Sequence, residues 1–299
     1  MDALPIWRSM MFVPVNVDKF VEGAHTRGAD VIILDLEDSI LPKDKERART
    51  MVAAAAPKVS RSGADVLVRV NRPWRLCLRD LEAIVDRGIY GLMLPKTESA
   101  DHVHLVAEVL DELEAERGLP RGHTRIIAMI ESAAAFFRMR EIAASHPRIV
   151  ALTLGSEDFA LSVGMVPEAE GLFYPKQQVV LAARAAGVLP LGFIGTVADY
   201  KDLEAFRATA RRSRRIGFTG ASVIHPSQIA ILNEEFRPSA DEVQKARRVV
   251  EAFEVARKGN AGAIEVDGKM VDIPVVERAR ATLERHEAIE KRSARAPRA

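Results

Sequence analysis

The strongest constraint on the fold is a regular alternation of short apolar runs with segments of helical character. Eight apolar runs occur, at residues 10–13, 31–34, 66–70, 92–94, 126–130, 150–154, 191–194 and 222–224. The segments between them carry Ala, Leu, Glu and Arg at helical spacing, as in residues 99–117 and 175–186. A strand followed by a helix, repeated along the chain, predicts a parallel sheet with right-handed crossovers.

Eight such units predict an α/β fold of the TIM (β/α)8 barrel type, which typically takes about 250 residues. The alternative is an open, doubly wound sheet. Its dinucleotide-binding version is disfavoured because no G-x-G-x-x-G motif follows any of the apolar runs.

The remainder of the chain predicts a C-terminal helical extension or lid. We place the barrel at residues 1–235 and the extension at 236–299. Within the extension we expect a helix over 238–258, a glycine-rich joint with the sequence KGNAGAIEVDGK, and a second helix over 274–291.

Charge and cysteine content narrow the class of protein. The 299 residues have a net charge of +1, which favours neither a nucleic-acid nor a membrane partner. The single cysteine, Cys77, rules out an internal disulfide. No apolar run approaches the roughly 20 residues of a membrane helix, and the N-terminus lacks the pattern of a signal peptide. The sequence therefore predicts a cytoplasmic protein.

Polar side chains follow seven of the eight predicted strands. In a barrel of this type, the residues that perform chemistry gather at the carboxyl ends of the strands. Solvent exposure alone explains any one of these polar residues, but the set combines acids with basic groups. Its members are Asn16, Asp35, Glu37, Asp38, Arg69, Asn71, Lys96, Glu131, Glu157, Asp158 and His225.

Two of these acids predict a magnesium site. Glu131 follows the fifth run directly, and Asp158 lies just after the sixth. Neighbouring strands are about 4.8 Å apart, so both carboxylates can reach one point. Oxygen ligands without His or Cys favour a hard cation such as Mg²⁺, whose open positions can take a 2-oxo or 2-hydroxy acid. Arg69 is suited to binding a carboxylate or an enolate oxygen.

Nine motifs occur in an order that resembles one family. They are RSMMFVP, GADVIILDLEDSILPKDKERAR, LVRVN, LPKTES, MIES, LGSEDFA, VLAARAAG, GFTGASVIHPSQI and VDGKMVDIPV. Together they span roughly residues 7–285 and are similar to the citrate lyase β-subunit-like family of the HpcH/HpaI aldolase superfamily, which includes malyl-CoA and citramalyl-CoA lyases.

The resemblance implies a Mg²⁺-dependent carbon–carbon lyase that forms a homo-oligomer, often a homotrimer or hexamer. It implies that Glu131 and Asp158 bind the metal, and that Arg69 binds substrate and steadies the enolate oxygen. Glu37 and Asp38 correspond to acids that hold metal-bound waters, and Asp272 to an acid or base on a C-terminal lid. The implied substrate is a 3-hydroxy-acyl thioester of malyl, citramalyl or citryl type.

The sequence departs from the family at three positions. Gly23 stands where a basic residue is common, Gly195 where an Asp is usual, and Ala221 where many relatives carry Lys. The acyl carrier is therefore open among CoA, an acyl-carrier protein and none. Two alternative functions remain: a metal-dependent 2-oxo-acid aldolase without a thioester, and a non-catalytic subunit of a lyase complex.

Overall fold

A computed structural model describes residues 4–196, 201–258 and 263–295 of the chain. The chain divides into two compact units, Met1–Phe236 and Arg237–Ala296. No described helix has the length and apolar character needed to cross a membrane.

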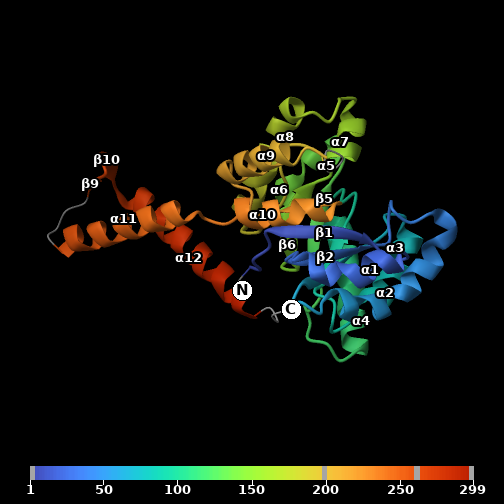
Figure 1. Cartoon of the computed structure of the whole chain (residues 1–299). Coiled ribbons are helices and arrows are strands. Elements are labelled where there is room, and N and C mark those ends of the chain that lie inside the picture. The colour runs from blue at the N-terminus through green and yellow to red at the C-terminus, as the bar shows by residue number, and fades with distance from the viewer. Residues whose placement is uncertain (1–3, 197–200, 259–262, 296–299) are drawn as a thin grey trace. The chain divides into compact units, whose positions relative to one another are not determined.

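The first unit, shown in Figure 1, is built on an eight-stranded parallel sheet. The strand order in this sheet is β7-β6-β5-β4-β3-β2-β1-β8. The strands are β1 (Ser9–Pro14), β2 (Val31–Asp35), β3 (Asp65–Arg69), β4 (Gly91–Leu94), β5 (Arg125–Ile130), β6 (Ile149–Leu154), β7 (Leu189–Pro190) and β8 (Ala221–Val223). The two ends of the sheet meet because Leu191 pairs with Gly220 in a parallel bridge and Gly192 N–H donates to the Gly220 carbonyl at 2.8 Å. The predicted (β/α)8 barrel is confirmed.

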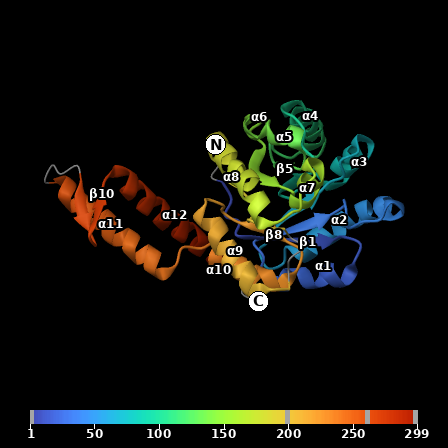
Figure 2. The ribbon, with the colours of Figure 1, turned by 90° about the horizontal axis from the view of Figure 1, so that it is seen from above.

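Helices connect the strands and lie around them in the view of Figure 2. They are α1 (Asp18–Ala24), η1 (His25–Arg27), η2 (Pro42–Asp44), α2 (Lys45–Val59), α3 (Trp74–Ile84), α4 (Ala100–Glu116), α5 (Ala133–Phe136), α6 (Met139–Ala144), α7 (Ser156–Val163), α8 (Ala169–Ala186), α9 (Leu203–Arg215), η3 (Pro226–Gln228) and α10 (Ile229–Glu235). The predicted start at residue 99 holds closely, because Ser99 caps α4 and its hydroxyl accepts from His102 N–H. The prediction for α8 was too short, since Pro175 lies inside that helix.

Alternation along each strand divides the core into two layers. In β2, Val31 and Ile33 belong to an apolar cluster inside the barrel. Ile32 and Leu34 of the same strand belong to the larger cluster that includes residues of the surrounding helices. All five residues of β2 are buried, as expected for a parallel strand covered on both faces. Each fully buried aliphatic side chain stabilises such a core by about 1.5–3 kcal/mol.

The seventh strand differs from the expectation. Residues 191–194 were predicted to form it, whereas β7 covers only Leu189–Pro190. Gly192 and Gly195 have φ values of 141° and 148°, in the region that favours glycine, so the chain leaves the strand conformation there. The pairing of β6 with β7 therefore ends at Leu152 and Pro190, two residues before the carboxyl end of β6.

The second unit has its own small core. It consists of α11 (Ala240–Lys258), β9 (Ile264–Val266), β10 (Lys269–Val271) and α12 (Ile273–Arg295). One cluster of buried apolar residues in this unit consists of Ala246, Val249, Phe253, Val271, Val276 and Ala279. The predicted glycine-rich joint is in its described part an antiparallel hairpin, whose turn residues Asp267 and Gly268 have positive φ angles of 51° and 70°. Residues 259–262 of that joint lie outside the described ranges.

Candidate active site

A cavity of about 610 Å³ lies in the first unit at the carboxyl ends of the strands. Its lining includes Arg69 at the end of β3, Glu131 just after β5, and Asp158 in the first turn of α7. The strand order explains this arrangement, because β2 to β6 are consecutive neighbours in the sheet and all end on the same side.

The guanidinium of Arg69 is held by the carboxylate of Asp35. The last residues of β2 and β3 are partners in the parallel ladder, which places these two side chains together. Arg69 Nε donates to Asp35 Oδ1 and Nη2 donates to Oδ2, both at 2.7 Å. Burial favours the neutral acid, but the hydrogen bonds and charge of Arg69 outweigh it and lower the pKa of Asp35. The guanidinium is therefore fixed in orientation by a bidentate contact.

The remaining nitrogen of Arg69 faces the next acids in sequence. Arg69 Nη1 lies 3.0 Å from Glu37 Oε2 and 3.5 Å from Asp38 Oδ2. Glu37 is buried, whereas the Asp38 side chain is 61% exposed. Burial is the main cause of the raised pKa of Glu37. The two acids predicted to act together thus differ in their surroundings.

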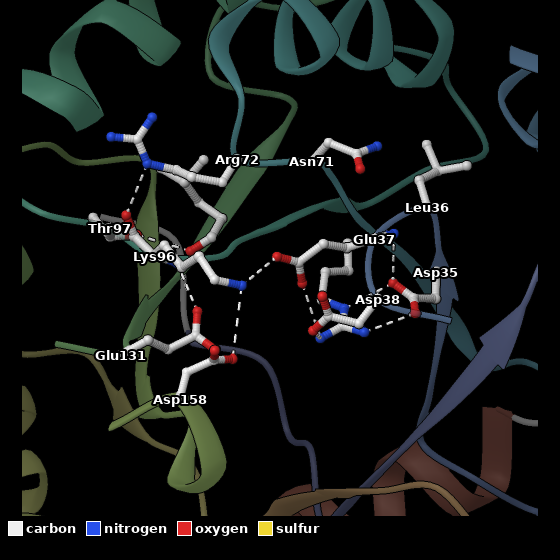
Figure 3. Close-up of polar contacts among 12 residues, drawn as sticks. Asp35, Leu36, Glu37, Asp38, Asn71, Arg72, Lys96, Thr97, Glu131 and Asp158 are labelled. Carbon is white, nitrogen blue, oxygen red and sulfur yellow. Dashed lines mark hydrogen bonds and ion pairs between the residues drawn. The ribbon is translucent and has the colours of Figure 1, made fainter. Parts of the chain in front are cut away.

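Lys96 connects the Glu37 side of the cavity with the Asp158 side (Figure 3). Its Nζ donates to Glu37 Oε1 at 2.8 Å and lies 3.6 Å from Asp158 Oδ2. Burial would lower the pKa of Lys96, but the hydrogen bond and charge of Glu37 outweigh it, so the pKa is raised and the ammonium is charged. Lys96 also has a φ of 47°, which is unusual for a residue other than glycine.

Glu131 is the most confined acid of the cavity. Its Oε2 accepts from the backbone N–H of Lys96 at 2.6 Å. Its other oxygen lies over the backbone of Gly155, where a Cβ atom would approach Oε1 to 2.4 Å. Burial is the main cause that raises the pKa of Glu131 to about 7. The hydrogen bond from the Lys96 backbone opposes this shift, whereas the charges of Glu37 and Asp158 add to it.

The carboxylates of Glu131 and Asp158 lie side by side in Figure 3. Among the described residues, no three His, Cys, Asp or Glu side chains form a metal-binding group. Two carboxylates suffice for Mg²⁺, which usually keeps water and substrate as its other ligands. The acids Glu37 and Asp158 lie close enough to act on Glu131 through their charges, and Gly155 leaves room for the Glu131 carboxylate. The donor set therefore fits a magnesium ion.

Two further predicted residues, Asn71 and Asp272, make hydrogen bonds to residues near them in the sequence. Asn71 turns towards α3, where its Nδ2 donates to Asp80 Oδ2 at 2.7 Å. Asp272 lies in the second unit, and its Oδ1 accepts from Val275 N–H at 3.3 Å at the start of α12. This is the geometry of a helix N-cap.

Sequence reasoning assigned no role to Asp35 or Gly155. The signal for Asp35 was its position, since it ends the same strand that precedes Glu37 and lies opposite Arg69 in a parallel pairing. No comparable signal identifies Gly155. Its role arises because Glu131, just after β5, approaches the backbone of Gly155, just after the neighbouring strand β6.

The other side of the cavity is basic and apolar. Lys19 and Phe20 of α1 and Arg27 of η1 line it. Gly23 lies in α1 between them, whereas Ala221 is fully buried as the first residue of β8. Of the three departures from the family, Gly23 has a basic group close by, because a Cβ atom on Gly23 would lie 3.6 Å from Arg27 Nη2.

The fold and these residues define a (β/α)8 barrel of the aldolase type with an acidic centre suited to a divalent cation. The family model described as HpcH/HpaI aldolase/citrate lyase matches residues 8–226. The chain belongs to this family.

Known relatives extend the similarity to nearly the whole chain. Citrate lyase subunit beta of Escherichia coli K12 is 36% identical over 285 residues, covering 94% of this chain and 93% of that protein. L-malyl-CoA/beta-methylmalyl-CoA lyase of Rhodobacter capsulatus is 34% identical over 295 residues, covering 91% and 92%. A crystal structure of CitE from Mycobacterium tuberculosis in complex with magnesium, acetoacetate and coenzyme A has a TM-score of 0.73 and 30% identity, covering 95% of this chain and 99% of that one.

Proposed function

We propose that this protein is a Mg²⁺-dependent carbon–carbon lyase that cleaves a 3-hydroxy-acyl thioester into a 2-oxo acid and an acyl thioester. The observation that carries this proposal is the position of Arg69 in the same cavity as the paired carboxylates of Glu131 and Asp158. The relatives named above are lyases of citrate and of malyl-CoA type, which is the same reaction class.

Glu131 and Asp158 would hold the metal, and Glu131 also contacts the substrate bound there. A bound Mg²⁺ would supply Lewis-acid polarisation of the oxygen that it binds. Glu37, which accepts a hydrogen bond from Lys96, and the exposed Asp38 would orient water at the rim of this site.

Arg69 performs the electrostatic part of the reaction. When the carbon–carbon bond breaks, the substrate hydroxyl gives its proton to a base and its oxygen becomes the 2-oxo oxygen, while negative charge develops on the thioester oxygen of the departing enolate. A guanidinium already oriented by Asp35 donates to that oxygen without reorganising, which is how fixed donors lower a barrier. Asp272 then supplies the proton to the enolate carbon, in our proposal from a lid formed by residues 236–299.

The basic residues beside the cavity support a carrier with phosphate groups. Lys19 and Arg27 are within the lining, and Phe20 is exposed beside them. A thioester of CoA would place its phosphates against these cations and its acyl group at Arg69. We therefore favour CoA over a free 2-oxo-acid substrate.

We further propose that the protein assembles as a homotrimer or hexamer. Large apolar side chains are exposed on α7, on α8 and directly after α5, namely Leu161, Tyr174, Leu181 and Phe137. Light scattering coupled to size-exclusion chromatography gives the mass, and a monomer would contradict the proposal.

Cleavage assays test the function. The wild-type protein is incubated with Mg²⁺ and malyl-, citramalyl- or citryl-CoA, and separately with free 4-hydroxy-2-oxo acids. Release of a 2-oxo acid from a thioester is expected, together with loss of Mg²⁺ binding in Glu131→Ala measured by calorimetry. Cleavage of the free acids alone would indicate an aldolase, and binding without turnover would indicate a non-catalytic subunit.

A further inference from the structure

Strand β6 presents to the cavity a hydroxyl that the proposed mechanism does not use. Thr153 lies on this strand, is 5% exposed and lines the cavity. Its hydroxyl makes no hydrogen bond within the described part of the chain, and its oxygen keeps some accessible surface, which at this buried position faces the cavity. A buried hydroxyl without a hydrogen-bond partner costs free energy.

The direction of the Thr153 side chain follows from the alternation along β6. Leu152 and Leu154 belong to the apolar cluster that includes residues of the surrounding helices, whereas Ala151 belongs to the cluster inside the barrel. Thr153 therefore faces inwards, as Ala151 does. Met129 of β5 is its partner in the parallel ladder and also lines the cavity, so the neighbouring strand offers an apolar side chain at this level.

The same face of β6 leads to the acidic centre. Gly155 follows Thr153 by two residues, and its φ of −74° and ψ of 108° continue the extended conformation. A Cβ atom on Gly155 would lie 2.4 Å from Glu131 Oε1, so this carboxylate fills the position that the next inward side chain of β6 would take. Residues two apart in a strand are separated by about 6.6 Å. The Glu131 carboxylate is therefore about one strand repeat from Thr153, with space for a bound group between them.

The arrangement of the cavity indicates which part of the substrate meets this hydroxyl. In the proposed function, the 2-oxo acid part lies at Glu131 and Asp158, and its carboxylate and oxo oxygens are hydrogen-bond acceptors. The acyl part lies instead beside Arg69 on β3, three positions away from β6 in the sheet. A hydroxyl that donates to an ionised carboxylate forms a stronger hydrogen bond than one that donates to a neutral group.

We propose that the Thr153 hydroxyl donates a hydrogen bond to the carboxylate of the 2-oxo acid part of the substrate. This inference rests on the proposed lyase function and deepens it by assigning one further substrate-binding residue. Binding of the 2-oxo acid supplies the partner that the hydroxyl lacks in the free protein. The role applies equally to malyl, citramalyl and citryl thioesters, because each of them yields a 2-oxo acid.

The sequence gives only a weak signal for this residue. Thr153 is the polar member of the apolar run VALTL at residues 150–154. Because threonine is β-branched and fits a strand as well as valine does, the run alone is equally compatible with a structural threonine. The open cavity beside the hydroxyl distinguishes the two roles.

Thr153→Val tests the inference, because valine keeps the shape of the side chain and removes the hydroxyl. Glyoxylate, pyruvate and oxaloacetate, the 2-oxo acids of the three candidate types, are titrated by calorimetry into wild-type protein with Mg²⁺. The acid that binds most tightly is then used for the variants. Thr153→Val should bind it about tenfold or more weakly than wild-type protein, and Thr153→Ser, which keeps the hydroxyl, should stay within about threefold.

Thr124→Val is the matched control. Thr124 is fully buried just before β5, at the opposite end of the barrel, and its hydroxyl also lacks a hydrogen-bond partner among the described residues. The same chemical change is thus made away from the cavity. The Kd of Thr124→Val for the 2-oxo acid should match that of wild-type protein within about twofold.

Stability and Mg²⁺ binding separate this role from a structural one. Since the Thr153 hydroxyl has no partner in the free protein, Thr153→Val should unfold at the same or a higher urea concentration than wild-type protein. It should also bind Mg²⁺ alone as wild-type protein does. An unchanged Kd for the 2-oxo acid, a loss of stability, or weaker binding of Mg²⁺ alone would overturn the inference. Wild-type protein that binds none of the three acids with Mg²⁺ would instead defeat the proposed lyase function.

A second measurement observes Thr153 in wild-type protein. In protein with ¹³C-labelled threonine methyl groups, the resonances missing from Thr153→Val and from Thr124→Val are assigned to these two residues. Addition of the 2-oxo acid to the Mg²⁺-loaded protein should shift the Thr153 resonance and leave that of Thr124 in place. Equal shifts of both resonances, or an unmoved Thr153 resonance while the acid binds, would contradict the inference.

Discussion

The guanidinium of Arg69 and the carboxylate of Asp35 form two parallel hydrogen bonds of 2.7 Å at the adjoining ends of β3 and β2. The Asp35 side chain is 1% exposed and the Arg69 side chain 13%. This contact leaves only Nη1 directed towards Glu37 and Asp38. In the proposed mechanism Asp35 is thus a positioning residue, which would act on the substrate through Arg69.

Asp35→Asn should therefore reduce both stability and turnover. Removing one charge of a buried pair typically costs about 3–5 kcal/mol, because the other charge remains buried and uncompensated. With Arg69 no longer fixed, we expect kcat for thioester cleavage to fall more than KM rises. Urea unfolding and steady-state kinetics measure the two effects. Glu22→Gln breaks the exposed Lys58–Glu22 pair and should leave the free energy of unfolding almost unchanged. Wild-type stability in Asp35→Asn would contradict this role.

Gly155→Ala should weaken magnesium binding without unfolding the barrel. The added Cβ would meet Glu131 Oε1 at 2.4 Å, so the carboxylate must leave its present position. We expect the Kd for Mg²⁺, measured by calorimetry, to rise by about tenfold or more, equivalent to about 1.4 kcal/mol. Gly23→Ala is the matched control, because its Cβ would approach nothing closer than Arg27 Nη2 at 3.6 Å. Equal Kd values for the two variants would show that Glu131 does not need this space.

Lys96→Met should have the opposite effect on magnesium. The Lys96 ammonium lies 2.8 Å from Glu37 and 3.6 Å from Asp158, where it neutralises acids that would otherwise attract a cation. Its removal makes the cavity more negative, so the Kd for Mg²⁺ should fall severalfold, while the protein loses stability because Glu37 is buried. Lys58→Met, which removes an exposed ammonium, serves as the control. Weaker Mg²⁺ binding in Lys96→Met would mean that Lys96 organises the site rather than competing for it.

The barrel was predictable because its signal is local and repeated. Each fully buried strand, such as β2, appears as a short apolar run, and the polar residue after it marks the strand end. The seventh strand was misplaced because Phe193 and Ile194 are apolar and buried, yet the glycines at 192 and 195 take them out of the sheet. In the second unit, the hairpin of β9 and β10 was missed although Asp267–Gly268 is a typical turn pair.

The sequence could predict which residues gather at the cavity, but not the contacts among them. Because consecutive strands are neighbours in the sheet, Arg69, Glu131 and Asp158 come together at the carboxyl ends of the strands, and the order of the motifs along the chain is enough to predict this. The pairing of Asp35 with Arg69 depends on strand register. The contacts of Lys96 with Glu37 and Asp158 are made by a residue whose own φ is positive, which the sequence does not reveal. Lys176 of α8 also lines the cavity, which it reaches from a surrounding helix, and no motif at a strand end could indicate this.

His102 should make the protein acid-sensitive between pH 6.5 and 4. It is buried in α4, and neither ring nitrogen has a hydrogen-bond partner within the described part of the chain. Burial, and then the charge of Arg72, lower the pKa of His102 to about 4. In this window the unfolded chain binds a proton that the native protein does not, so the free energy of unfolding falls as the pH falls, by at most about 1.4 kcal/mol per pH unit. Urea unfolding at several pH values should show this extra slope in wild-type protein and in His104→Phe, an exposed histidine of the same helix, but not in His102→Phe. Parallel curves for wild-type protein and His102→Phe would show that His102 is protonated equally in the native and unfolded states.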